Sequence, residues 1–328
     1  MTAGVLTFGE TMLLLAGTGV GAVPDLDTMR VDTGGAESNV AIGLARAGVP
    51  VTWIGRVGAD PAGDRVLADV RREGVTVTEV RDPERPTGIM VKERLPDGRT
   101  RVTYHRRGSA ASALTPGDVP AGAVEDAALV HVTGITSALS RSASDTVSAV
   151  LDRAEAAGVP VSFDVNHRAK LLDAGTARAR YRSVAQRSAV VFAGDDEARL
   201  VLGRDEQDGD EEALAHDLAA LAHGVAVVKL GSRGAVASVG GRLFRRAATR
   251  VRVVDPVGAG DAFVAGWLAA RLGGADPDAA LDAAADAGAL ACTVESDWHR
   301  PDPAALRHHT HPDVDDGVDH TVHDRVDR

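Results

Sequence analysis

Short apolar runs alternate with alanine-rich helical stretches along most of the chain, and this alternation constrains the fold more than any other feature. The runs that predict strands are residues 5–8, 51–54, 129–132, 159–164, 189–192 and 225–230. The patterns that predict helices are residues 36–47, 61–73, 142–157, 174–187, 211–222, 260–272 and 277–291. Continuously apolar strands that alternate with helices are typical of a parallel sheet covered on both faces. The sequence therefore predicts an α/β fold with a mostly parallel central sheet.

Two segments break the alternation. Residues 88–107 predict two strands joined by a β-turn, because a Pro-Asp-Gly sequence lies between them. We expect this hairpin to leave the main sheet and form a small β lid, built from about residues 12–31 and 86–108. A second hairpin is predicted over residues 235–247, where two glycines supply the turn.

Composition limits the classes of protein to consider. The chain has 328 residues, 44% of them hydrophobic, which is enough for one large α/β domain. No apolar run approaches the roughly 20 residues of a membrane span, and the first residues carry no basic segment of a secretory signal. A single cysteine, Cys292, suits a reducing compartment, and a net charge of −11 argues against nucleic-acid binding. We expect a cytoplasmic protein that binds neither membranes nor nucleic acids.

The last part of the chain differs from the rest. Residues 308–328 are polar, acidic and poor in large apolar side chains, which predicts a disordered tail after a folded domain of residues 1–307. His308, His309 and His311 could bind a metal ion, but in a polar tail we favour solvated histidines.

The sequence VDPVGAGDAF, residues 254–263, joins an apolar run to a predicted helix. A helix that begins at Gly258, Ala259 and Gly260 presents bare backbone N–H groups, and its dipole favours an anion such as phosphate. Asp261 follows at once. A carboxylate beside an anion site is unfavourable unless it has another role, such as taking a proton from an attacking hydroxyl. From its spacing alone, Asp261 could equally be a helix N-cap.

Two further glycine-rich turns follow predicted strands or precede helices. Residues 34–39, GGAESN, allow two interpretations. They could bind a ligand at the N-terminus of a helix, or Ser38 and Asn39 could simply cap that helix. Residues 229–234, KLGSRG, close a strong predicted strand and would suit a nucleotide, although many strand ends look similar. The sequence contains no P-loop pattern, and no G-x-G-x-x-G follows the first strand.

The segments DTGGAESNVAIGLARAGV, GRVGADPAGDRV and VDPVGAGDAF resemble the signature motifs of the ribokinase-like (PfkB) sugar kinases. The resemblance covers about residues 4–306. TYHRRGSAAS, GITSALS and FDVNHR are similar to the 2-keto-3-deoxygluconate kinases rather than to ribokinase. The resemblance implies a three-layer αβα sandwich with a small β lid, a homo-oligomer formed through that lid, and the use of ATP with Mg²⁺. It is also compatible with a monovalent cation such as K⁺.

The resemblance also implies roles for individual residues. It makes Asp261 the catalytic base, and it assigns the anion hole to Gly258, Ala259 and Gly260. The residues that it implies for the sugar are Gly34, Gly35, Ala36, Glu37, Ser38, Tyr104, Arg106, Arg168, Asp261 and Asp297. Those that it implies for ATP are Asn166, Arg168, Lys229, Gly231, Ser232, Gly234, Gly258 and Gly260. It implies that Glu197 acts on the metal, through water.

Three positions depart from the family pattern. Gly194 stands where the family has the asparagine of an N-x-x-E motif that ends at Glu197. Met90 stands where a tyrosine is expected in the lid, and ESDWHRP replaces the usual glycine–aspartate turn around Asp297.

Two arginines favour an acidic substrate. Arg106 ends the predicted lid hairpin and Arg168 follows a predicted strand, so both are expected at the crevice. The planar guanidinium group binds a carboxylate through two hydrogen bonds, which a neutral sugar cannot use. Arginine is abundant here, and outside these motifs such residues would more often lie on the surface.

The sequence therefore predicts an ATP-dependent kinase that phosphorylates the terminal hydroxyl of 2-keto-3-deoxygluconate. Its alternatives are a kinase for a neutral sugar or nucleoside of the same family, and a catalytically silent sugar-binding sensor. An intact Asp261 behind Gly-Ala-Gly argues against the silent protein.

Overall fold

The computed structural model describes residues 3–97, 99–205 and 210–295, and its centre is a nine-stranded sheet. The strand order is β13-β12-β11-β10-β9-β8-β1-β4-β5. Neighbouring strands from β11 to β5 in this order are parallel, and β12 and β13 form an antiparallel extension. The strands are β1 (Val5–Phe8), β4 (Val51–Gly58), β5 (Thr76–Asp82), β8 (Leu129–Thr133), β9 (Val161–Asp164), β10 (Val190–Gly194), β11 (Val225–Lys229), β12 (Ala235–Val239) and β13 (Arg242–Arg246).

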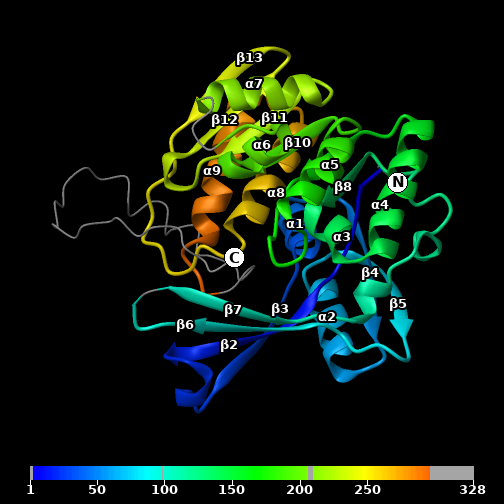
Figure 1. Ribbon diagram of the computed structural model, residues 1–328, viewed down its shortest axis with the longest axis vertical. Coiled ribbons are helices and arrows are strands. Elements are labelled where there is room, and N and C mark those ends of the chain that lie inside the picture. The colour runs from blue at the N-terminus through cyan, green and yellow to red at the C-terminus, as the bar shows by residue number, and fades with distance from the viewer. Residues whose placement is uncertain (1–2, 98, 206–209, 296–328) are drawn as a thin grey trace.

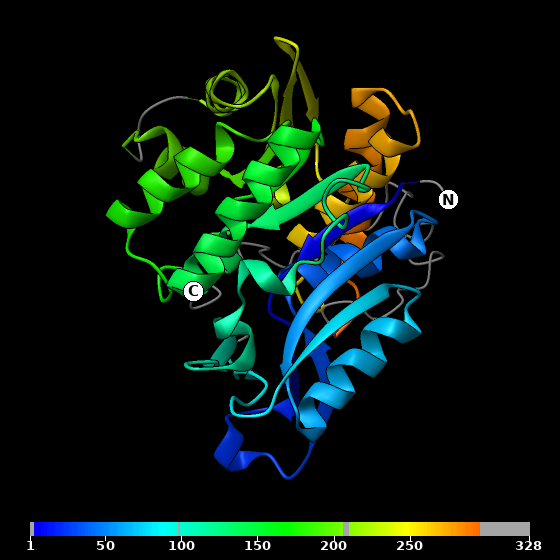
Figure 2. The same ribbon diagram turned by 90° about the vertical axis from the view of Figure 1, so that its right-hand side faces the viewer.

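Helices cover both faces of this sheet, as Figures 1 and 2 show. One layer contains α1 (Ala36–Arg46), α2 (Pro61–Arg72), α8 (Ala259–Leu272) and α9 (Pro277–Ala291). The other contains α3 (Gly134–Leu139), α4 (Arg141–Ala157), α5 (Ala174–Ala185), α6 (Asp195–Leu202) and α7 (Glu211–Leu221). Each layer packs its apolar side chains against one face of the strands, which makes two separate cores. The predicted three-layer αβα sandwich is confirmed.

Four strands form a second, small sheet that projects from the sandwich (Figure 1). Its order is β3-β2-β6-β7, and its strands are β2 (Met12–Val20), β3 (Met29–Gly34), β6 (Ile89–Arg94) and β7 (Thr100–His105). One face buries a cluster of its own, made of Met12, Leu14, Ala16, Met90 and Val102. The hairpin predicted between residues 88 and 107 is present, and the stretch near residue 12 contributes the other two strands.

Some short or polar elements were not predicted from the sequence. β5 is an edge strand whose residues alternate between polar and apolar, so it lacks the continuous apolar run of the inner strands. α3 and α6 have six and eight residues, too few for a clear helical period. The predicted boundary at residue 307 and the histidines at 308–311 lie outside the described residues.

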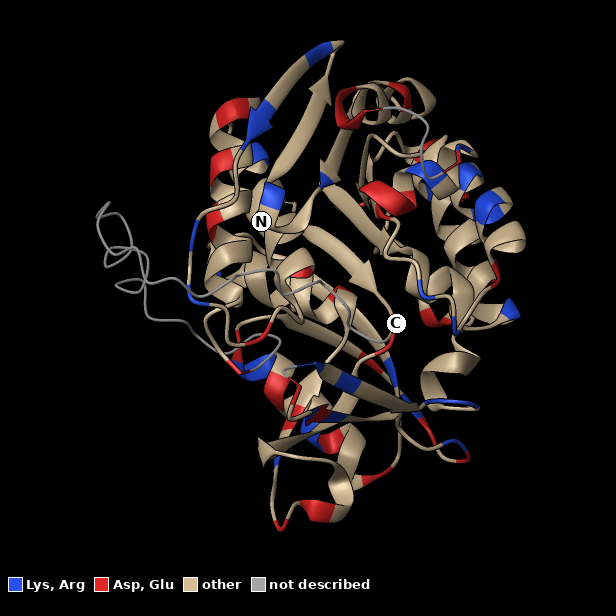
Figure 3. Cartoon of the chain, turned by 60° about the vertical axis from the view of Figure 1, so that its left-hand side comes forward, with Lys and Arg blue, Asp and Glu red and all other residues tan. Residues whose placement is uncertain are grey.

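The distribution of charged residues separates the outer elements from the inner strands. Acidic and basic residues occur in the outer helices, the loops and the small sheet, whereas the inner strands carry few charged residues (Figure 3). Among the helices that the structure describes, none combines the length and the hydropathy needed to span a bilayer.

Candidate active site

The carboxyl ends of the central parallel strands bring several ionisable side chains to one edge of the large sheet. Asp164 ends β9, Gly194 ends β10 and Lys229 ends β11, and the strand register places Gly194 directly beside Lys229. Helix α8, which carries Asp261, begins close to the same edge, because Lys229 Nζ lies 3.6 Å from the Cβ position of a side chain at Gly260. In open α/β sheets this edge is where ligands bind.

Asp261 is buried in the first turn of α8, and amide groups hold both of its oxygens. Asn39 Nδ2 in α1 donates to Oδ2 at 2.8 Å, and Asn166 Nδ2 donates to Oδ1 at 3.3 Å. Asn166 itself has a φ of +38°, a left-handed conformation that an asparagine adopts only at a cost. Two segments remote in sequence therefore fix the orientation of one carboxylate.

The environment of Asp261 changes its acidity. Burial raises the pKa of Asp261 to about 7, although the hydrogen bond from Asn39 acts in the opposite direction. A carboxylate with a pKa near neutrality is a far better proton acceptor than an exposed aspartate.

The turn before Asp261 has the geometry of an anion site. Gly258 is the N-cap of α8 with a φ of 84°, a left-handed conformation that favours glycine. The first N–H groups of a helix lack intrahelical partners and lie at the positive end of its dipole. The ammonium of Lys229 adds a full positive charge near Gly260. Gly258, Ala259 and Gly260 thus lie where a phosphate would be stabilised.

Lys229 forms a buried ion pair. Its Nζ contacts the two carboxylate oxygens of Asp164 at 2.8 and 3.0 Å. Burial alone would lower the pKa of Lys229, but the carboxylates of Asp164 and Glu197 outweigh it and raise that pKa, so the ammonium stays charged. Asp164 was not among the predicted site residues. An acid at the end of a fully buried strand is the signal that could have identified it.

Glu197 is the residue that the sequence linked to a metal. The backbone N–H of His167 donates to Oε1 and that of Gly194 donates to Oε2, both at 2.7 Å. Burial would raise the pKa of Glu197, but Lys229, these N–H groups and Arg168 outweigh it and lower that pKa. The residue is therefore a fixed anion at the start of α6.

These residues fit a magnesium ion that is carried mainly by a nucleotide. Mg²⁺ commonly uses one or two protein carboxylates together with waters and substrate phosphates. Within the described residues no group of three or more histidine, cysteine or acidic side chains is arranged to hold a metal ion by itself. Glu197 and Asp164 supply carboxylates of the required kind beside the anion site. Gly194 leaves ordinary van der Waals space for a side chain, since its Cβ would meet Glu197 Oε2 at 3.5 Å.

The glycine turn before α1 is tightly enclosed. A Cβ at Gly35 would lie 2.3 Å from the carbonyl oxygen of Glu10, so glycine is required there. Ala36, Glu37 and Ser38 are buried. The Glu37 carboxylate accepts hydrogen bonds from Thr133 Oγ1 at 2.6 Å and from Thr136 Oγ1.

Arg106 has a partner that the sequence did not indicate. Its Nε and Nη2 contact Glu10 Oε2 at 2.6 and 2.5 Å, and Ser109 donates to the other oxygen of Glu10. The guanidinium carbon lies 5.7 Å from the centre of the Tyr104 ring. Arg106 also acts electrostatically on Glu37, which places this cluster beside the glycine turn.

The remaining predicted residues are divided between two places. Arg168 is half-buried, and its charge acts on Asp164, Glu197 and Asp261, so it lies near these three carboxyl groups. The turn of Gly231, Ser232 and Gly234, which the sequence assigns to ATP, follows β11 and is exposed or half-exposed.

Asn166 and Asp297 complete the account of the predicted residues. Asn166, assigned to ATP from the sequence, donates a hydrogen bond to Asp261 Oδ1. Asp297 lies outside the described residues.

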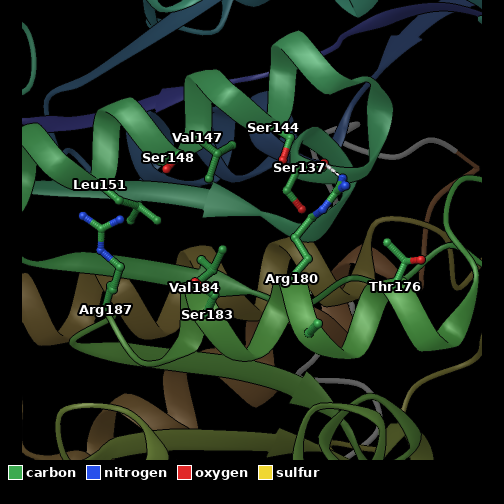
Figure 4. Close-up of a pocket in the computed structure, with 11 residues that line it drawn as sticks. Ser137, Ser144, Val147, Ser148, Leu151, Thr176, Arg180, Ser183, Val184 and Arg187 are labelled. Carbon is green, nitrogen blue, oxygen red and sulfur yellow. Dashed lines mark hydrogen bonds between the residues drawn. The ribbon is translucent and has the colours of Figure 1, made fainter.

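A cavity of about 400 Å³ lies between α4 and α5, apart from this cluster (Figure 4). Serine hydroxyls, aliphatic side chains, Arg180 and Arg187 line it, and Arg180 donates to the carbonyl oxygen of Ser137. It contains none of the predicted site residues. This cavity is therefore separate from the cluster of ionisable side chains at the strand ends.

Asp261 should destabilise the folded protein at high pH. Because its folded pKa of about 7 exceeds the unfolded value of 3.8, the folded state retains a proton that the unfolded state has lost between these pH values. The stability that this proton contributes is present below pH 4 and is lost as the pH rises through 7. At about 1.4 kcal/mol per pKa unit, Asp261→Asn should raise the free energy of unfolding above pH 8 by up to about 4 kcal/mol relative to the wild type. Urea denaturation at pH 5 and pH 9 measures this difference, and an equal effect at both pH values would contradict the raised pKa.

Comparison with known proteins places the chain in a family. Residues 2–303 match the model of the pfkB family carbohydrate kinases. The 2-dehydro-3-deoxygalactonokinase of Haloferax volcanii is 33% identical over 90% of this chain and 93% of its own length. The 2-dehydro-3-deoxygluconokinase of Bacillus subtilis is 34% identical over 90% of this chain and 92% of its own.

A solved structure extends the likeness to three dimensions. A putative ribokinase II from E. coli, in complex with ATP and Mg²⁺, has a TM-score of 0.82 and 25% identity over 90% of this chain and 94% of that one. The sheet, the helix layers and the motifs of this protein therefore have one explanation: the chain belongs to the pfkB family of carbohydrate kinases and is a phosphotransferase that acts on a sugar hydroxyl.

Proposed function

We propose that this kinase transfers the γ-phosphoryl group of ATP to the terminal hydroxyl of 2-keto-3-deoxygluconate. The observation that carries the proposal is a buried carboxylate of raised pKa, Asp261, directly beside a helix N-terminus suited to phosphate. The names of the relatives support a 2-keto-3-deoxy sugar acid as the substrate. The cytoplasm, where ATP is plentiful, is the compartment that we propose for the reaction.

In this proposal Asp261 is the general base. Asn39 and Asn166 hold its carboxylate so that one oxygen can accept the proton of the sugar hydroxyl as that hydroxyl attacks phosphorus. The proton leaves the hydroxyl as the new O–P bond forms, and the bond to the ADP oxygen breaks. The N–H groups at Gly258, Ala259 and Gly260 stabilise the negative charge that spreads over the transferring phosphoryl oxygens.

Nucleotide binding falls to the turn after β11. We assign Gly231, Ser232 and Gly234 to ATP, with Lys229 near the phosphates because its ammonium lies close to Gly260. When bound, Mg²⁺ would neutralise phosphate charge, and Glu197 would hold it through water.

The glycine turn before α1 and the small sheet would bind the sugar acid. We propose that Gly34 to Ser38 line the sugar and that Tyr104 covers it from the small sheet. Arg106 and Arg168 would bind the carboxylate, because a guanidinium has five N–H donors and the described bonds of Arg106 to Glu10 use only Nε and Nη2. Asp297 remains a proposed contact from the sequence alone.

One observation favours a neutral sugar instead. Glu10 already neutralises Arg106, so the positive charge that faces the crevice is smaller than the sequence indicates. With Glu10 present, Arg168 becomes the arginine on which discrimination between an acid and a neutral sugar depends.

Substrate preference tests the proposal. We expect kcat/KM for 2-keto-3-deoxygluconate to exceed that for fructose or ribose by at least about 10²-fold. Arg168→Ala should lower kcat/KM for the acid about 30-fold or more, as when one partner of a charge-assisted pair is lost, and should change that for the neutral sugars little. ATP consumption across a panel of sugar acids and neutral sugars measures both.

Arg107, the exposed residue that follows Arg106, provides the control. Arg107→Ala should have the same kcat/KM for the acid and for the neutral sugars as the wild type. Equal losses on acid and neutral sugars in Arg168→Ala would contradict an acid-specific role. Arg106→Ala should be made together with Glu10→Gln, because the single variant leaves a buried carboxylate without its partner.

We also propose that the small sheet is a lid and that two copies of the chain associate through it. The face opposite its buried cluster carries five aliphatic side chains in register: Leu13, Leu15, Val31, Ile89 and Val91. Val31 is 43% exposed. A continuous aliphatic patch of this kind on a sheet face is typical of a protein interface.

A charge on this face should prevent association. Sedimentation equilibrium should give twice the mass of one chain for the wild type and the mass of one chain for Val31→Asp, because burying an unpaired carboxylate in an apolar interface is costly. Leu272→Asp, at a residue that is 42% exposed on α8, is the matched control and should leave the mass unchanged. A wild-type protein with the mass of one chain at micromolar concentration would exclude the proposed dimer.

A further inference from the structure

A buried ion pair joins the small sheet to the turn that carries the anion site. Lys92 Nζ, on β6, contacts Asp255 Oδ2, and the two side chains are only 8% and 5% exposed. The strand register places Lys92 between Ala16 and Val102, on the face with the buried cluster of the small sheet. The ammonium therefore extends from the inner face of the small sheet toward the sandwich.

Asp255 shapes the turn that leads to the catalytic helix. Its Oδ1 accepts a hydrogen bond from the backbone N–H of Val257 at 3.2 Å. The backbone N–H groups of Val254 and Asp255 both donate to the carbonyl oxygen of Cys292, at 2.8 and 3.2 Å. Gly258 lies three residues after Asp255, so the carboxylate that pairs with Lys92 also fixes the start of the anion site.

The residue type at this position supports a specific role. The chain has three lysines against 33 arginines, yet lysines make the two buried contacts beside this turn: Lys92 with Asp255 and Lys229 with Asp164. An ammonium is a compact point charge, whereas a guanidinium is broad and planar. Two compact cations thus neutralise two of the acids that would otherwise repel a phosphate from the helix N-terminus.

We propose that Lys92 is a positioning residue for phosphoryl transfer. By binding Asp255 it fastens the small sheet to the 255–261 turn, so the anion site takes its working shape only while the sheet lies against the sandwich. The inference rests on the proposed role of residues 258–261. Arg30 and Arg94 also reach across, to Glu295, but these contacts are exposed and lie beyond the turn.

Removing the charges in two steps separates positioning from stability. Lys92→Met leaves Asp255 buried without its cation and should lower both the melting temperature and kcat/KM for the sugar, the latter about 30-fold or more. The double variant Lys92→Met with Asp255→Asn removes both charges of this pair. Its melting temperature should return close to that of the wild type, while kcat/KM should stay at least about 10-fold low because the link is missing.

Two further measurements complete the test. The ATP dissociation constant of the double variant should stay within about twofold of the wild type, since the turn at 229–234 is untouched. Amide hydrogen exchange over residues 255–263 should be faster in the double variant. Arg101→Met is the control, because Arg101 pairs with Glu93 inside the small sheet and should leave turnover and exchange unchanged.

Recovery of both stability and turnover in the double variant would overturn the inference, since it would show a purely structural ion pair. Unchanged exchange over residues 255–263 would overturn it as well. Failure of the proposed mechanism would give a different result. A variant of Asp261 would remain active, while the amide exchange of the 255–263 turn would still become faster when Lys92 is replaced.

Discussion

The structure depends on keeping a carboxylate buried beside a site built for an anion. Asp261 would be repelled by a phosphate at the N-terminus of α8, and burial already disfavours its charge. Two asparagines stabilise it, one from the helix after the first glycine turn and one from a strained position after β9. The packing of α1 against α8 and the unusual backbone at Asn166 bring the two asparagines to this carboxylate.

Charged side chains near this carboxylate occur in pairs of opposite sign. The fixed cations therefore create no large net electrostatic field. Lys229 pairs with Asp164 at the strand ends, and Arg106 pairs with Glu10 below the small sheet. In our proposal, a phosphate beside Lys229 and a substrate carboxylate beside Arg106 would add a further anion to these pairs. The overall charge of −11 is no obstacle, because solution salt screens charges farther than about 8–10 Å.

The sequence predicted the layers of the fold and the helix that begins at the Gly-Ala-Gly turn, since both are local properties. Continuous apolar runs identify inner strands, and Gly258 to Asp261 form one contiguous motif. It did not predict that Asn39 reaches Asp261, because the two residues are 222 positions apart and only the packing of α1 against α8 brings them together. The partners of Arg106 and Lys92 were missed for the same reason. A charged side chain in a motif does not reveal which opposite charge the fold will place beside it.

The role of Asp261 as the proton acceptor is the central claim, and replacing its carboxylate by an amide tests it most directly. Asp261→Asn preserves the size of the side chain and can still accept a hydrogen bond from Asn39, so ATP binding should match the wild type by equilibrium dialysis. Turnover of the sugar acid, measured on the folded variant under saturating ATP, should fall by about 10²- to 10⁴-fold, the usual contribution of general base catalysis. A folded variant that binds ATP and turns over at a near-normal rate would contradict the account.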